Sequence, residues 1–268
     1  MRGGLVGTTV LGELRGAQKP AKGVSLYSRY VNRPAGRYLA AGAYRAGLTP
    51  NQVTLVSAAF TLAGIAAVGL VRPSWPLALA VYAALAVGFA FDSADGQLAR
   101  LTGKGGPAGE WLDHVVDCVK MVALHTAVLI SFYRFFELPS DGWLLLPLGF
   151  QLAAVVTFCA GLLTEQLKRA AAQGATRAVP DVAANTDGIP SAGKAGGVPP
   201  VAAPPSRLRA VALLPVDYGV FCLVFLTLGA PGLFRVVYAV LAAVHTLFLV
   251  AFLAKWFREL AALPRNPA

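Results

Sequence analysis

Four aspartates lie at helical spacing in a part of the chain that otherwise has the composition of a membrane-buried segment: Asp92, Asp95, Asp113 and Asp117. Each aspartate at mid-membrane depth costs about 2.5 to 3.5 kcal/mol on insertion scales, so the group needs a compensating cation. Residues three or four apart share a helix face, so each of the two pairs points one way. Carboxylate-only ligands favour Mg²⁺ or Mn²⁺, and two such ions can clamp a pyrophosphate during an in-line displacement. The spacing therefore predicts a two-metal phosphoryl-transfer site.

Residues suited to binding a phosphate or a nucleotide surround these acids. Gly96 and Ala99 lie on the stripe of the first pair and lack bulk, so a ligand can approach the backbone closely. Arg100, on the same stripe, offers a fork of donors that matches phosphate oxygens. Lys120 shares the face of the second pair, where it either binds a substrate phosphate or balances the acids. Arg207 and Arg209 are further candidates for a phosphate, or else are anchors at the membrane surface.

The elements that must position these residues are transmembrane helices. With 56% hydrophobic and 13% charged residues over 268 positions, the chain is too apolar for a soluble domain of this size. Six stretches have about the length that a helix needs to cross the hydrocarbon layer. They are residues 52–71, 74–91, 111–133, 143–163, 210–230 and 236–254. We therefore expect an all-α integral membrane protein with six transmembrane helices.

Basic residues sort by loop, which predicts the orientation. Nineteen of the 23 Lys and Arg residues fall in segments that six spans would place on one side. By the positive-inside rule both termini and the acidic segment face the cytoplasm, and we expect a bacterial plasma membrane. The net charge of +10 then points to anionic lipid head groups as partners rather than to nucleic acid.

The chain divides into three parts. Residues 1–48 are expected to form a cytoplasmic arm whose segment 25–48 is an amphipathic interfacial helix, broken at Pro34, although a solvated basic arm is the alternative. Residues 49–258 form the six-helix catalytic domain, and 259–268 are a C-terminal tail. Within the domain, residues 170–206 are rich in Ala, Gly and Pro and are expected to be a flexible cytoplasmic loop.

Written as a pattern, the acidic segment resembles the signature of the CDP-alcohol phosphatidyltransferase family. The pattern is Asp92-x-x-Asp95-Gly96-x-x-Ala99-Arg100, eight residues, then Gly109-x-x-x-Asp113-x-x-x-Asp117. The run Leu48-Thr49-Pro50-Asn51-x-Val53-Thr54 is also similar to the equivalent segment of many members. The resemblance covers roughly residues 25 to 258.

The resemblance implies an activity and a role for each residue of the pattern. The activity is transfer of a phosphate-linked group from a CDP-linked donor to an alcohol, with release of CMP, by a homodimer. Asp92, Asp95 and Asp113 would ligate the metals, and Asp117 would ligate one metal and act as general base. Gly96, Ala99, Arg100 and Gly109 would line the cytidine diphosphate site.

The identity of the two substrates stays open. The donor is either CDP-diacylglycerol or a soluble CDP-alcohol. No Glu-Arg-Pro-Glu-Arg-like stretch precedes the fifth span, which counts against inositol phosphate as the acceptor. The variant Gly109-Glu110-x-x-Asp113-His114 is closer to choline and ethanolamine phosphotransferases, which use diacylglycerol. A cation-coupled transporter using the same aspartates is the main alternative, and a catalytically silent scaffold is a third.

Overall fold

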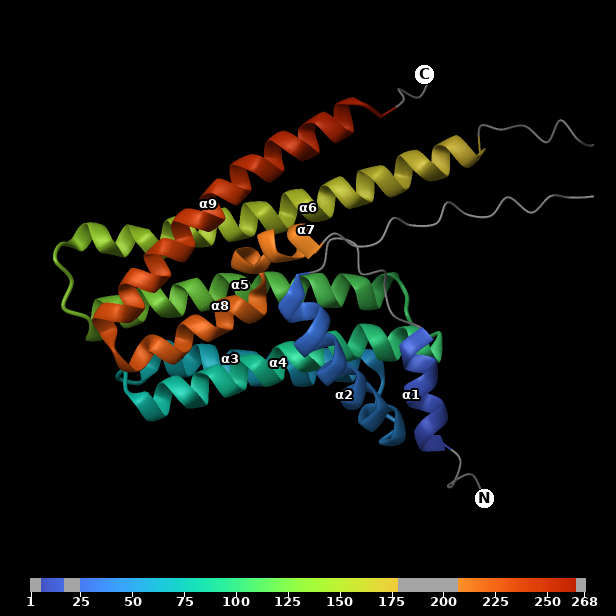
Figure 1. Cartoon of the computed structure of the whole chain (residues 1–268), viewed down its shortest axis with the longest axis horizontal. Coiled ribbons are helices and arrows are strands. Elements are labelled where there is room, and N and C mark those ends of the chain that lie inside the picture. Colours follow the sequence, from blue (N-terminus) through green and yellow to red (C-terminus); the bar gives the residue numbers. More distant parts are fainter. Residues whose placement is uncertain (1–5, 17–24, 178–206, 264–268) are drawn as a thin grey trace, which may run out of the picture.

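The protein is described from a computed structural model, which covers residues 6–16, 25–177 and 207–263. The described residues are helical with short connections and contain no strand (Figure 1). The α-helices are α1 Val6–Gly16, α2 Arg33–Arg45, α3 Pro50–Leu70, α4 Trp75–Thr102, α5 Pro107–Phe135, α6 Leu145–Arg177, α7 Arg207–Ala212, α8 Tyr218–Val224 and α9 Pro231–Ala261. A π-helical segment, η1 Ser28–Asn32, precedes α2, and the 3₁₀ segments are η2 Asp141–Leu144, η3 Leu214–Val216 and η4 Phe225–Gly229.

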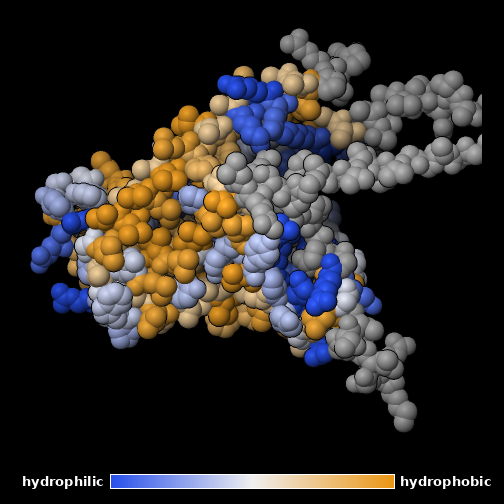
Figure 2. Space-filling model, viewed as in Figure 1, coloured by the Kyte–Doolittle hydropathy of each residue, from blue (hydrophilic) through white to orange (hydrophobic). Residues whose placement is uncertain are grey.

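Five of these helices, α3, α4, α5, α6 and α9, are long and apolar enough to cross a membrane. A sixth span exists if the bent pair Ala210–Val216 and Tyr218–Gly229, which meet at 49°, crosses as one unit. Large apolar side chains remain exposed along the bundle, for example Leu152 at 65% and Leu247 at 71%. Figure 2 shows a broad hydrophobic surface on one face of the bundle, which hydrocarbon would cover. The prediction of an integral all-α membrane protein is confirmed, and the count lies between five and six.

The ends of the long helices lie in two groups at opposite ends of the bundle. In Figure 1, α1, the turn between α4 and α5, and the C-terminal ends of α6 and α9 lie at one end of the bundle. The connections from α3 to α4 and from α5 to α6 lie at the opposite end. Among the described residues, the turn that follows the first aspartate pair therefore lies at the same end as α1 and the C-terminal ends of α6 and α9.

Two clusters of buried side chains hold the bundle together. Aromatic rings of α5, α6, α8 and α9 fill the larger one, including Phe132, Phe150, Phe221 and Tyr238. In the smaller one, α2 packs on α4 through small residues such as Ala40 and Ala94, which let the two backbones approach closely. The second cluster therefore holds the N-terminal segment against the helix that carries the first two aspartates.

The N-terminal helix corrects one expectation. Residues 26–45 are helical without interruption, so the predicted break at Pro34 is wrong. Pro34 stands at the start of α2, directly after the π-helical segment η1, and this locally widened turn accommodates the proline ring. Tyr30 and Tyr38 point outward and are 62% and 67% exposed, which suits an interfacial helix.

Two boundaries also differ from the expected ones. Helix α6 continues to Arg177, so residues 170–177 are helical rather than part of a loop. The Ala-rich stretch there favours helix over coil. The remainder of the predicted flexible loop, 178–206, lies outside the described residues. Helix α9 likewise continues to Ala261, into the predicted tail.

Candidate functional site

Helices α4 and α5 bring the acidic motif together at a sharp turn. Helix α4 continues past Phe91 to Thr102 and ends at Gly103, whose φ of 64° lies in the left-handed region that glycine adopts readily. Helix α5 starts at Pro107, a favoured first helical residue. The predicted helical extension and turn are therefore present, and the two aspartate pairs lie on neighbouring helices.

Three of the four aspartates form a compact cluster. One carboxylate oxygen from each of Asp92, Asp95 and Asp113 can be chosen so that all lie within 4.8 Å of one another. Oxygen-only donors at this spacing fit a hard divalent cation such as Mg²⁺ or Mn²⁺. Asp95 is nearly enclosed, at 6% exposure. A cation bound in the cluster would therefore stabilise its ionised form.

Asp117 lies against a lysine instead of completing this cluster. The Lys120 ammonium donates to the Asp117 carboxylate at 3.2 Å and to the Asp92 carboxylate at 2.6 Å. A third bond reaches the Ser57 hydroxyl on α3 at 3.1 Å. Of the two roles considered for Lys120, balancing the acids is the one that these contacts display. Asp92 thereby belongs both to the cluster and to the lysine pair.

Helix α3 contributes polar groups that the sequence analysis did not assign. Thr54 donates its hydroxyl to the Asp95 carboxylate at 2.6 Å, which fixes the orientation of that ligand. Helix α3 begins with a reciprocal capping box between Thr49 and Gln52. The signal for Thr54 was present in the run from Leu48 to Thr54, which carried part of the family resemblance. Ser57 had no such signal.

A polar cavity of about 670 Å³ opens beside the cluster. All four residues predicted to line a nucleotide site are on its wall: Gly96, Ala99, Arg100 and Gly109. Asp95 and Asp113 form part of the same wall. Gly109 allows a close approach, because a Cβ there would lie 3.2 Å from the Asn51 Oδ1 atom.

The rim of this cavity carries charged residues beyond the motif. Glu110 and His114 of α5 line it, and Glu110 accepts from the Arg169 guanidinium of α6 at 2.8 Å. This pair ties α6 to the start of α5. The motif variant already included Glu110 and His114, but no pattern indicated Arg169, because it meets Glu110 only across two helices.

On the N-terminal helix, burial and then the charge of Arg29 lower the pKa of Arg33, and Gln97 donates to the Arg33 carbonyl at 3.1 Å.

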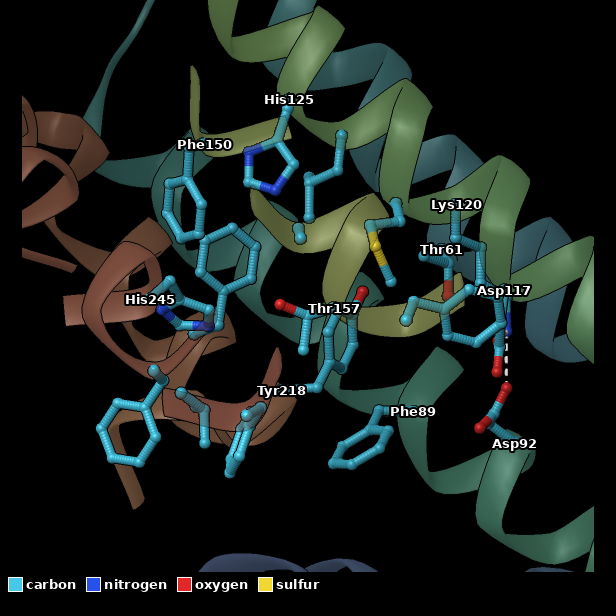
Figure 3. A pocket seen from close by; sticks show the side chains of 18 residues that line it. Thr61, Phe89, Asp92, Asp117, Lys120, His125, Phe150, Thr157, Tyr218 and His245 are labelled. Carbon is cyan, nitrogen blue, oxygen red and sulfur yellow. Dashed lines mark hydrogen bonds and ion pairs between the residues drawn. The ribbon is translucent and has the colours of Figure 1, made fainter. Parts of the chain in front are cut away.

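A second cavity, of about 350 Å³, is mainly apolar and is lined by other acids of the motif than the polar cavity. Asp92, Asp117 and Lys120 lie at one end of it, and His125, Phe150 and His245 lie toward the other (Figure 3). His125 is buried, and its Nδ1 pairs with the Tyr238 hydroxyl at 2.6 Å. The four acids are therefore divided between a polar cavity and an apolar one.

The remaining predicted residues lie elsewhere. Asp217, two residues after Pro215, accepts from the Gly219 amide at 2.7 Å and so caps the start of α8. It also accepts hydrogen bonds from the hydroxyls of Ser25 and Ser28, tying the N-terminal segment to the bent helix pair. The side chains of Arg207 and Arg209 lie outside the described part of the structure, so their predicted contact with a phosphate stays a prediction.

Comparison with known proteins agrees with this geometry. A family model described as CDP-alcohol phosphatidyltransferase matches residues 47–194, more than half of the chain, including all eight motif positions. The chain is also similar to an uncharacterized CDP-alcohol phosphatidyltransferase class-I family protein of Schizosaccharomyces pombe, with 31% identity over 107 residues. That match covers 35% of this chain and 26% of the relative, so the chain spans about a quarter of the relative's length. The chain belongs to the CDP-alcohol phosphatidyltransferase family, a family of membrane transferases of phospholipid synthesis.

Proposed function

We propose that the protein transfers a substituted phosphate group from a CDP-linked donor to an alcohol hydroxyl and releases CMP. The observation that carries this proposal is the position of the aspartate cluster. Two of its members, Asp95 and Asp113, line the polar cavity together with Arg100, and the third, Asp92, lines the apolar cavity together with Asp117. This arrangement suits a reaction between two substrates, because each substrate can occupy one cavity and meet the other at the aspartates.

The polar cavity suits the cytidine diphosphate part of the donor. Arg100 offers paired donors to phosphate oxygens, and the small residues Gly96, Ala99 and Gly109 leave the backbone accessible. Lys104 lies on the same wall and adds positive charge. A nucleotide diphosphate would therefore be held by its charge and by its shape.

Asp92, Asp95, Asp113 and Asp117 would hold the divalent ions, for which we propose Mg²⁺ or Mn²⁺, two in number. Bound there, such ions stabilise the charge that develops on the attacking and leaving oxygens. The chain's own contribution is to orient the carboxylates. Thr54 does this for Asp95, and Lys120 does it for Asp92 and Asp117.

Asp117 is placed to receive the proton of the acceptor. The acceptor oxygen forms a bond to the phosphorus that carries the donor's alcohol, and the bond from this phosphorus to the oxygen retained by CMP breaks. The acceptor proton passes to the Asp117 carboxylate, which faces the second cavity. Lys120 holds this carboxylate in place at 3.2 Å. The contact of Lys120 with a substrate phosphate stays a prediction, since its three donors bond Asp92, Asp117 and Ser57.

We further propose the membrane arrangement. The bent pair from Ala210 to Gly229 crosses as one broken span, which gives six spans, and its break is capped by Asp217. The basic end then faces the cytoplasm of a bacterial plasma membrane, with the acidic cluster near that surface. Anionic lipids contact the basic residues there, and the family resemblance supports a homodimer.

The experiment is an assay of CMP release. Purified protein in nanodiscs with Mg²⁺ is supplied with CDP-linked donors and a panel of alcohols, and the lipid product is identified by mass spectrometry. We expect CMP only with a donor and an acceptor together, and none from the Asp95→Asn and Asp113→Asn variants. Absence of CMP from every pair contradicts the proposal. The family match does not favour a cation-coupled transporter, which would instead show ion flux in liposomes without CDP-linked substrates.

A further inference from the structure

We propose that the acceptor is a membrane-dissolved alcohol whose hydrocarbon part occupies the apolar cavity, and that the donor is therefore a water-soluble CDP-alcohol. This inference rests on the proposed function and deepens it, because it assigns a substrate class to each cavity. Either type of donor is compatible with the motif. The distinction comes from the second cavity.

The four aspartates are divided between the two cavities. Asp95 and Asp113 face the polar cavity together with Arg100, whereas Asp117 and Asp92 face the apolar one. Donor and acceptor must approach the transferred phosphorus from opposite directions in an in-line displacement. If the nucleotide fills the side of Arg100, the hydroxyl that gives its proton to Asp117 comes from the apolar side.

The lining of this cavity selects against a water-soluble polyol. Phe89, Phe158 and Phe248 are among the aromatic residues around it, with aliphatic residues such as Leu124 and Val216 between them. A polyol with several hydroxyls would lose its hydration there without gaining enough hydrogen-bond partners, which is unfavourable. A hydrocarbon chain loses nothing by the same transfer. The volume of about 350 Å³ lies within the range of small-molecule pockets.

Polar groups stand singly among these apolar side chains away from the acids, which suits a lipid with isolated oxygens. The Tyr218 hydroxyl is enclosed, and no oxygen or nitrogen of the described residues bonds to it; the weakly bonding Cys222 thiol is its polar neighbour. Figure 3 shows Tyr218, Thr157 and His125 around the space that leads away from Asp117. One or two ester carbonyls on a glycerol backbone would give such donors partners, while the acyl chains meet the rings.

The reaction then balances as follows. The free hydroxyl oxygen of the lipid bonds to the phosphorus that carries the soluble alcohol, and its proton passes to Asp117. The bond between this phosphorus and the oxygen kept by CMP breaks, so CMP leaves toward the polar cavity. The product is a phospholipid that remains in the membrane.

The test compares two substrate pairings in nanodiscs with Mg²⁺. One combines CDP-choline or CDP-ethanolamine with dioleoylglycerol, and the other combines CDP-dioleoylglycerol with glycerol 3-phosphate, inositol, inositol phosphate or serine. We expect CMP and a new phospholipid from the first pairing. CMP from the second pairing alone overturns this inference but leaves the proposed function intact. CMP from neither contradicts the proposed function, and this inference with it.

A variant that narrows the apolar cavity can show whether the cavity holds a lipid acceptor or the acyl chain of a lipid-linked donor. Ala154 of α6 lines the cavity, so Ala154→Phe should raise the KM for the lipid alcohol at least tenfold while the KM for the CDP-linked donor stays unchanged. The matched control is Leu152→Phe, two residues away on the exposed surface of the same helix, which should change neither constant. A rise in the donor KM alone assigns the cavity to the donor and overturns the inference.

Thermal unfolding shows whether the Ala154 variant folds. If it does not, Thr157→Met at the same wall adds less volume and is measured in the same way. A Thr157→Met protein that folds and keeps both constants at their original values also contradicts the assignment.

Discussion

Lys120 and Asp92 form an ion pair of 2.6 Å that joins α5 to α4 at the boundary between the two cavities. Both side chains are largely removed from solvent, at 8% and 22% exposure. The same ammonium reaches Asp117, so one cation serves two carboxylates of the motif. Removing one partner of a buried ion pair typically costs about 3 to 5 kcal/mol, because the other charge is left uncompensated.

Replacing Lys120 by Met should therefore lower the stability of the metal-free protein by several kcal/mol, roughly 3. A divalent ion can replace the missing charge, so Mg²⁺ should raise the unfolding temperature more in the variant than in the parent protein. Thermal unfolding with and without Mg²⁺ measures both effects. Lys255→Met, at an exposed pair with Glu259, is the control and should change little. Equal stability of the Lys120 variant and the parent contradicts this reading of the pair.

Asp95→Asn and Asp113→Asn should each remove a metal ligand. We expect the Mn²⁺ affinity to fall by at least about tenfold, since each carboxylate supplies one charge and one donor to the cluster. Titration of Mn²⁺ followed by electron paramagnetic resonance measures the affinity directly, without reference to activity. Asp141→Asn, in η2 at the opposite end, is the matched control. An unchanged affinity in both variants would show that the cluster is not the metal site.

Asp117→Asn should abolish turnover and leave donor binding measurable. An amide cannot accept the hydroxyl proton, and loss of a general base costs about 10² to 10⁴ in rate. Donor binding persists because Asp117 does not line the polar cavity. CMP release and calorimetric binding of a CDP-linked donor provide the two measurements. Turnover at the parent rate removes Asp117 from the base role.

Arg100→Ala should weaken binding of CDP by roughly tenfold or more, because charge-assisted bonds from a guanidinium contribute about 1.5 to 3 kcal/mol each. Arg100→Lys keeps the charge but loses the planar fork of donors, so its affinity for CDP should fall between those of the parent protein and of Arg100→Ala. Calorimetry with CDP gives the affinities. Arg258→Ala, on α9 outside the polar cavity, is the control. The nucleotide assignment fails if CDP binds all three proteins equally.

Asp217→Ala should release the N-terminal segment from the bent helix pair. The variant loses the cap of α8 and the bonds from Ser25 and Ser28, at a cost of about 1 to 2 kcal/mol for the cap alone. Hydrogen exchange of residues 25–45 should become faster than in the parent protein. Asp217→Asn retains an acceptor and should show a smaller change. Unaltered exchange in the Ala variant means that this tie does not hold the segment.

Much of the site could be predicted from the sequence because it depends on distances along single helices. The spacing of Asp92 to Asp95 places both on one face of α4, and composition alone indicated the spans that carry them. The turn after Thr102 followed from its glycines and Pro107. These features are local, and local periodicity determines them.

The rest depends on how helices meet, which spacing does not encode. Asp113 and Asp117 share a face of α5, yet only Asp113 joins the cluster, whereas Asp117 accepts a bond from Lys120 and lines the apolar cavity. The continuous helix through Pro34 depended on a π-helical turn, and no pattern in the sequence marks such a turn. The apolar cavity itself draws residues from several helices that are distant in the chain.

Helix α4 carries residues of both cavities on adjacent turns, with Asp92 at the apolar one and Asp95 at the polar one. Three helical residues span about 4.5 Å, and each added residue rotates those beyond it by about 100°. A single insertion or deletion between these positions would turn one carboxylate away from its partner compartment without harming the helix. We therefore expect relatives to vary in loop length while keeping the three-residue interval from Asp92 to Asp95 constant. This interval would set the position of a water-soluble reactant relative to one dissolved in lipid.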